Sequence, residues 1–218
     1  MSYTEIVNVC ISVVSILIAL FALFQTNRQI SLSNKQQLFD RRLSRYIEFT
    51  MIYDLYKTNK HHLKDEKAFC YTNDLTFSWL TNCSELETMM HAIKNPLHQD
   101  EQNVFLKKYE ELKNTAIEIS MIFDGNTVKV VGEFVLSYAD LLNAMYKQQV
   151  FISKLEKANE SDSKPLSGEV YESKCKKMAE KVGLFRLCDK LASLDEEIRN
   201  KNIIGSMEDS LRLMKVTK

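Results

Sequence analysis

An uninterrupted apolar segment lies near the start of the chain. No charged residue occurs between Ile6 and Asn27, and most of these 22 positions carry large aliphatic or aromatic side chains. In a helix, such a segment rises roughly 33 Å, which matches the hydrocarbon core of a bilayer at about 30 Å. We therefore predict that residues 1–27 form a single transmembrane anchor.

A cleaved signal peptide is the main alternative to a retained anchor. It would have a basic leader, a shorter apolar core and a small-x-small cleavage site. Here the leader is acidic through Glu5, and the apolar segment ends in the bulky pair Leu23 and Phe24. These flanks favour a helix that stays in the membrane.

Residues 28–60 continue with a helical pattern of a different kind. They contain neither Gly nor Pro, and charged residues occupy the faces beside one stripe. Steps of four and three residues connect the members of the stripe, which are Leu32, Gln36, Phe39, Leu43, Tyr46, Thr50 and Tyr53. This spacing predicts an amphipathic helix that can continue the span as a stalk, with its stripe packed in a core or an interface.

The remaining residues, 61–218, are expected to form a cytoplasmic helical domain. Apolar residues recur at helical spacing over 84–94, 99–123, 127–145, 170–182, 184–199 and 206–216. Ser84 and Glu87 have the spacing of a capping box, Asp124 and Gly125 suggest a turn, and the polar stretch 158–168 suggests a loop. The valine-rich segment 128–131 could form a short strand instead of a helix. The fold class is therefore all-α.

Charge predicts the orientation of the anchor. The whole chain is neutral, with 29 basic and 29 acidic residues, but only Glu5 precedes the span. Five basic residues follow it against the single acid Asp40, namely Arg28, Lys35, Arg41, Arg42 and Arg45. The positive-inside rule places this side in the cytoplasm and the short N-terminus outside. Next to anionic headgroups, each basic residue would contribute about 1 kcal/mol of membrane attraction.

One face of the predicted span differs from the others in being small or polar. Its members are Asn8, Ser12, Ser15, Ala19, Ala22 and Thr26, which follow one another at steps of four and three residues. Small residues let helices approach closely, and hydroxyl or amide groups can hydrogen-bond across the contact. We predict that this association seam pairs with a second copy or with a partner helix. A plain span that tolerates three hydroxyls, or a face that lines a pore, would give the same pattern.

The motifs that carry common enzyme chemistry do not occur in the sequence. It contains no phosphate-binding glycine loop, no H-E-x-x-H, no C-x-x-C and no G-x-S-x-G. Cys70, Cys83, His91 and His98 are too widely spaced for a compact zinc site, and the adjacent pair at 61–62 points in two directions on a helix. We therefore expect no enzyme activity, no catalytic residue, no cofactor and no metal.

A basic run occurs far from the membrane. It consists of Lys174, Lys176, Lys177 and Lys181 and is interrupted by Glu180. A basic run of this kind can contact nucleic acid, but interspersed acids and zero net charge favour a solvated face of mixed charge.

The segment Ser33–Tyr46, with the pattern Asn-Lys-Gln-x-Leu-Phe-Asp-x-Arg-Leu-x-x-Tyr, directly follows the short span. This arrangement resembles small bacterial membrane-anchored phage-defence proteins, and in size and layout it is similar to the transmembrane effectors encoded beside retron reverse transcriptases. Those effectors usually have two spans. The next most apolar region here, residues 116–151, carries too many charges to be an ordinary span.

The resemblance implies an antiviral effector of the abortive-infection type in the bacterial inner membrane. A regulatory protein or ribonucleoprotein would keep it silent, and its release would let copies oligomerise and disrupt the membrane. A membrane-tethered helical scaffold or sensor, which docks a cytoplasmic partner without changing permeability, is the alternative expectation. An enzyme with an unrecognised site is a third.

Overall fold

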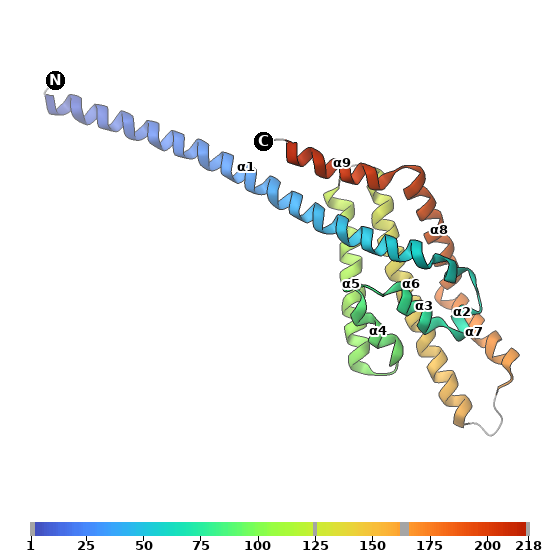
Figure 1. The fold of residues 1–218 in the computed structure, drawn as a ribbon. Coiled ribbons are helices and arrows are strands. Elements are labelled where there is room, and N and C mark those ends of the chain that lie inside the picture. Colours follow the sequence, from blue (N-terminus) through green and yellow to red (C-terminus); the bar gives the residue numbers. More distant parts are fainter. Residues whose placement is uncertain (1–2, 124–125, 162–165, 217–218) are drawn as a thin grey trace.

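The computed structural model describes residues 3–123, 126–161 and 166–216, and within these ranges the chain is all-α, with helices and no strand. Its shape is a helical body from which one long helix projects, so that the N-terminus lies far from the body (Figure 1). The expected fold class is confirmed for the described residues.

The projecting helix is α1, which runs without a break from Tyr3 to Asn59 over 57 residues. It contains no Gly or Pro, the residues that most often break or kink helices. The predicted anchor and stalk are therefore two parts of one helix, and the structure has no joint at residue 27. The short 3₁₀ helix η1 (Lys60–Lys64) follows directly.

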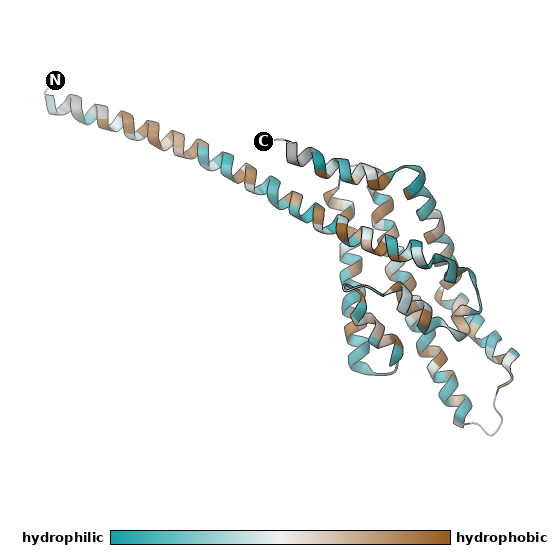
Figure 2. Ribbon diagram, in the orientation of Figure 1, coloured by the Kyte–Doolittle hydropathy of each residue, from teal (hydrophilic) through white to brown (hydrophobic). Residues whose placement is uncertain are grey.

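The two ends of α1 have opposite environments. Every residue from Ile11 to Gln37 is exposed, whereas Phe49, Ile52 and Tyr56 are buried in the body. Within the exposed part, residues 11–24 are predominantly hydrophobic, whereas residues 25–37 are predominantly hydrophilic (Figure 2). By length and composition α1 is a helix that could cross a membrane, and none of its apolar window is buried; an N-terminal signal sequence would meet the same criteria.

The body is built around α6 (Asn126–Ser161). It packs most extensively against α5 (Gln99–Ile122) and α8 (Leu184–Asn200), with α7 (Gly168–Val182) and α9 (Ile203–Val216) completing the bundle. The last turns of α1 enter this core. Phe134 of α6 contacts three aromatic rings of α1, with centroid distances of 6.2, 5.4 and 5.3 Å to Phe49, Tyr53 and Tyr56.

Short helices connect α1 to the bundle. These are α2 (Ala68–Tyr71), α3 (Asn73–Leu80) and α4 (Glu87–Lys94). The predicted capping box is wrong, because α4 begins at Glu87 after the N-cap residue Leu86 and has no side-chain cap. Ser84 lies before this helix in a turn and caps nothing there.

Most of the predicted helices of the body are present with small shifts of their ends. The strand alternative for 128–131 is wrong because these residues lie within α6. The expected loop at 158–168 is shorter than predicted, since α6 continues to Ser161 and α7 begins at Gly168. The turn expected at Asp124 and Gly125, and the middle of that loop at 162–165, lie outside the described residues.

Candidate functional site: the anchor helix and its base

The predicted seam lies on the exposed part of α1. Within one chain its hydroxyls bond the helix backbone: Ser12 Oγ donates to the carbonyl of Asn8 at 2.9 Å, Ser15 Oγ to Ile11 at 2.9 Å, and Thr26 Oγ1 to Ala22 at 2.8 Å. Because each proton already has an acceptor, these groups enter lipid at lower cost. Their oxygen lone pairs remain able to accept a hydrogen bond from a neighbouring helix.

The five basic residues that follow the span fall into two groups. Arg28, Lys35 and Arg41 are exposed on α1. Arg42 is 8% exposed; its Nε donates to the carbonyl of Ile122, and its guanidinium lies 5.7 Å from the ring centre of Phe123. We therefore restrict the lipid-contact prediction to the exposed group.

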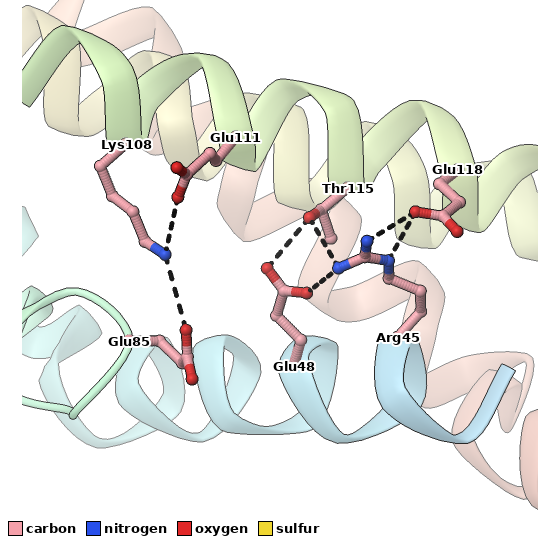
Figure 3. Close-up of polar contacts among 7 residues, drawn as sticks. All are labelled: Arg45, Glu48, Glu85, Lys108, Glu111, Thr115 and Glu118. Atoms are coloured by element: carbon pink, nitrogen blue, oxygen red, sulfur yellow. Dashed lines mark hydrogen bonds and ion pairs between the residues drawn. The ribbon is translucent and has the colours of Figure 1, made fainter. Parts of the chain in front are cut away.

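Arg45, the other basic residue withdrawn from that prediction, joins α1 to α5. Its guanidinium contacts Glu118 at 2.6 Å and Glu48 at 2.6 Å, and Glu48 in turn accepts a hydrogen bond from Thr115 at 3.0 Å (Figure 3). Partial burial opposes the charge, but the two carboxylates outweigh it and raise the pKa of Arg45. The guanidinium is therefore held charged between the two helices.

A similar lysine-centred contact lies further along the same side of α5. Lys108 Nζ lies 3.1 Å from Glu111 on its own helix and 3.5 Å from Glu85 in the turn before α4 (Figure 3). Lys108 is 17% exposed at its side chain, while both carboxylates are about half exposed. Such a contact fixes the loop on α5 but contributes little stability, because its carboxylates remain solvated.

The base of α1 is also bound to α8 through a buried carboxylate, Asp195. Tyr53 Oη donates to Asp195 Oδ1 at 2.8 Å, and Lys60 Nζ lies 2.8 Å from Asp195 Oδ2. Arg199 Nη2 approaches the same oxygen at 3.3 Å. Burial alone would raise the pKa of this carboxyl, but Lys60 and Tyr53 together with Arg199 lower it. Asp195 is thus held ionised in the interior.

A third contact joins α1 to α9. Tyr46 Oη donates to Glu208 at 2.6 Å. Burial, with the carboxylate as the second cause, raises the pKa of Tyr46 to about 12, so the phenol remains a donor at neutral pH. The base of α1 is therefore attached to α5, α8 and α9 by separate polar contacts, which we call the polar clamp: Arg45–Glu118, Tyr46–Glu208 and Tyr53–Asp195.

A cleft of about 560 Å³ lies beside Asp195. Lys60, Lys64 and Arg199 line it together with Glu66 and Glu196, and Phe185 supplies an apolar wall. The lining carries charges of both signs, so the cleft has no single electrostatic preference. No sequence motif marks this cleft, because its residues come from the end of α1, from η1, from the turn that follows it and from α8.

The other residues considered from sequence are dispersed. Lys174, Lys176, Lys177 and Lys181 are exposed on α7, and Lys176 pairs with Glu66 at 2.8 Å, which agrees with a solvated face of mixed charge. His62 packs on Trp79 at 3.9 Å between ring centres. In the part of the chain that the structure describes, no three His, Cys, Asp or Glu side chains are grouped as metal ligands.

Two cysteines that are far apart in the sequence are neighbours in the fold. Cys70 of α2 and Cys175 of α7 are buried in one small cluster with Ile152. Burial raises the pKa of Cys175 to about 11, so its thiol is unreactive at neutral pH. Cys188 is half-buried beside the cleft. Cys175 therefore behaves as a small buried apolar residue.

Comparison with known proteins identifies no relative of this chain. No known protein family, curated protein or solved structure matches the chain. Function must therefore be inferred from the residues of this chain.

Proposed function

We propose that the chain is a membrane-anchored effector of bacterial antiviral defence of the abortive-infection type. In this proposal residues 1–27 cross the inner membrane once, with the N-terminus outside and the body in the cytoplasm. A regulatory protein or ribonucleoprotein holds the body and keeps the effector silent. Release lets the seams of several copies associate and disrupts the membrane.

The observation that carries this proposal is the continuity of α1. One uninterrupted helix supplies both the exposed apolar segment and the buried residues Phe49, Ile52 and Tyr53 of the core. A partner that binds the body therefore acts on the element that would enter the membrane. No flexible linker separates the two, as it would in a protein that is merely tethered.

The seam supports the step at the membrane. In a single chain its hydroxyl protons are bonded internally, so an isolated span is compatible with lipid. When helices associate, a hydroxyl that turns away from its backbone carbonyl can donate to a hydroxyl oxygen of the next copy across a contact of small residues. Such a face can accept hydrogen bonds from a neighbouring helix or from water.

The test replaces Ser12 and Ser15 by leucine in the full-length chain, produced in bacteria that carry a membrane-potential dye. We expect the double variant to insert normally but to leave the potential intact, whereas the wild-type chain lowers it. The matched control is Val13→Leu with Val14→Leu, which adds similar bulk outside the seam and should keep the wild-type effect. Loss of potential with both serines replaced would contradict a role for the seam.

The cleft beside Asp195 favours the second candidate function, a tethered scaffold or sensor. A concave site of about 560 Å³ with charges of both signs suits a docked partner segment. A wild-type chain that never changes the membrane potential, yet retains a partner through the cleft, would support this function over the effector.

A further inference from the structure

The face of α1 that continues the seam beyond the membrane stays open all the way to the body. Continuing the steps of four and three from Thr26 gives Gln29, Ser33, Gln36, Asp40, Leu43 and Ile47. All six are exposed, Leu43 to 36% and Ile47 to 57%. Because α1 is unbroken from Tyr3 to Asn59, this set and the seam form one continuous face.

The body holds α1 from the other side. The buried residues of this part of the helix are Arg42, Phe49, Ile52, Tyr53 and Tyr56, and none of them belongs to the open face. In heptad terms, the open face occupies the a and d positions, and Arg42, Phe49 and Tyr56 recur at position c. The contacts that fix α1 to the body thus leave the a and d positions exposed, with α9 bordering them on one side through Tyr46 and Glu208.

Leu43 and Ile47 form an apolar ridge between two grooves. On one side lies a groove of about 370 Å³ lined by Phe39, Tyr46 and Leu211. On the other lies a groove of about 580 Å³ lined by Ser44, Met51 and Glu85. Leu43 borders both grooves. A ridge flanked by grooves is the surface that a second helix packs against.

Basic charge on this segment lies outside the open face, whose single charged member is Asp40. The flanking e and g positions between residues 28 and 47 are Ile30, Leu32, Gln37, Phe39, Ser44 and Tyr46, and all are uncharged. Arg28, Lys35 and Arg42 fall at position c, Arg41 at b and Arg45 at f, all outside the a and d positions, although Arg45 still lines the groove of about 580 Å³. An acidic partner would bind the basic side of α1 and not the open face. A second copy of this basic segment can approach only with these residues turned away.

We propose that the ridge of Leu43 and Ile47, with the open face leading to it from the membrane, is the docking surface for α1 of a second copy in parallel orientation. The inference rests on the proposed function only in taking α1 as a membrane anchor, which sets the copies parallel. On a straight helix, positions that repeat every seven residues drift around the axis by about 20° per heptad. Two helices that keep such positions in contact therefore wind around each other in a left-handed supercoil.

Asp40 is the single acid on the open face between Gln29 and Ile47. In a parallel pair of copies it faces its own counterpart, and two like charges at an a position oppose association. The repulsion between the two Asp40 side chains weakens pairing. Weak pairing suits an assembly that forms only after the regulator releases the body. Asparagine at this position keeps the shape and removes the repulsion.

Cysteine cross-linking of the full-length chain in bacterial membranes tests the pairing. Ser33→Cys places a thiol on the open face, and Ser31→Cys places one two residues away at position f; both sites are exposed. On oxidation with copper phenanthroline, we expect at least about fivefold more disulfide-linked dimer for Ser33→Cys, because only facing positions bring the α-carbons within about 7 Å. The wild-type chain gives the background from native cysteines. Equal dimer from both variants would overturn the proposal.

The ridge is tested in the Ser33→Cys background. Ile47→Lys should reduce the dimer about tenfold, while Ile117→Lys, at a 54% exposed site on α5, should leave it unchanged. Asp40→Asn should increase the dimer, which a different occupant would not require. A dimer yield insensitive to Ile47→Lys would show that the ridge is not the contact.

The same cells separate this inference from the proposed function. A membrane potential that collapses although Ser33→Cys does not cross-link would overturn the ridge and leave the effector standing. Strong cross-linking with an intact potential would support the ridge and overturn the effector.

Discussion

The hydroxyl of Tyr53 on α1 donates a hydrogen bond to Asp195 on α8 at 2.8 Å, across 142 positions of sequence. Both side chains are buried, and Lys60 completes the neutralisation of the carboxylate. This contact fixes the last turns of α1 to a helix near the other end of the chain. Removing a single atom from this contact should therefore weaken the attachment of α1 to the body.

Removing the hydroxyl of Tyr53 should destabilise the body. We expect Tyr53→Phe to lower the free energy of unfolding by about 1.5–3 kcal/mol, since a hydrogen bond to a buried charge is lost. Tyr56→Phe is the control, because no hydrogen bond of its hydroxyl is recorded among the described residues; it should cost less than about 0.5 kcal/mol. Urea denaturation of the detergent-solubilised chain measures both. Equal losses would show that the Asp195 contact carries no special stability.

Acid should weaken the same contact. The pKa of Asp195 is lower in the folded chain than its ordinary value, so the folded state favours the carboxylate. This stabilisation is complete above the ordinary aspartate pKa of about 3.9 and is lost as the pH falls through the lower folded value. Asp195→Asn should therefore be less stable than the wild type at pH 7, with a difference that shrinks towards pH 3. Parallel stability curves for the two proteins would contradict this assignment.

The close packing of α5 against α6 near Ala116 depends on Gly132. A β-carbon there would lie 2.8 Å from the backbone carbonyl of Ala116 and would overlap the hydroxyl of Ser120. Gly132→Ala should therefore destabilise the body by about 1–3 kcal/mol despite the better helix propensity of alanine. Gly168→Ala, where no atom lies within 4 Å of the added carbon, should be neutral or slightly stabilising. Thermal unfolding followed by circular dichroism compares the two; equal midpoints would refute the close approach.

Two arginines four positions apart should behave differently. Arg45→Gln breaks the contacts to Glu48 and Glu118 and should cost about 1–2 kcal/mol of unfolding free energy. Arg41→Gln removes an exposed charge and should leave stability within about 0.5 kcal/mol of the wild type. Thermal midpoints of both variants decide this. A stability loss from Arg41→Gln equal to that from Arg45→Gln would mean that exposure does not separate their roles.

Local patterns in the sequence predicted most of the helices, because each depends on the spacing of nearby residues. The absence of Gly and Pro over 28–60 predicted the stalk, and apolar periodicity placed α5 and α8 almost at their observed ends. The capping box failed because the backbone N–H of Glu87, which Ser84 was expected to cap, donates to the carbonyl of Cys83 at 2.9 Å in the turn before α4. The spacing of Ser84 and Glu87 in the sequence cannot show that another acceptor replaces the side-chain cap.

The base of α1 could not be predicted in the same way. Arg42 and Arg45 have the composition of a juxtamembrane basic cluster, yet their partners are supplied by α5, more than seventy positions away. In the sequence, Asp195 cannot be distinguished from a solvent-exposed acid on an amphipathic helix. Only the fold brings Tyr53 and Lys60 beside it. A hint was available in the aromatic stripe that ends at Tyr53, which indicated that this part of α1 is packed.

The lack of glycine and proline throughout α1 has a mechanical consequence. A rod without a compliant point passes on both tilt and axial twist, so a partner that turns the body by a few degrees would swing the far tip through several ångströms. A reorientation of the body would then move α1 as a single unit. Inserting a pair of glycines near Asn27 should uncouple the motion of its two ends without removing either.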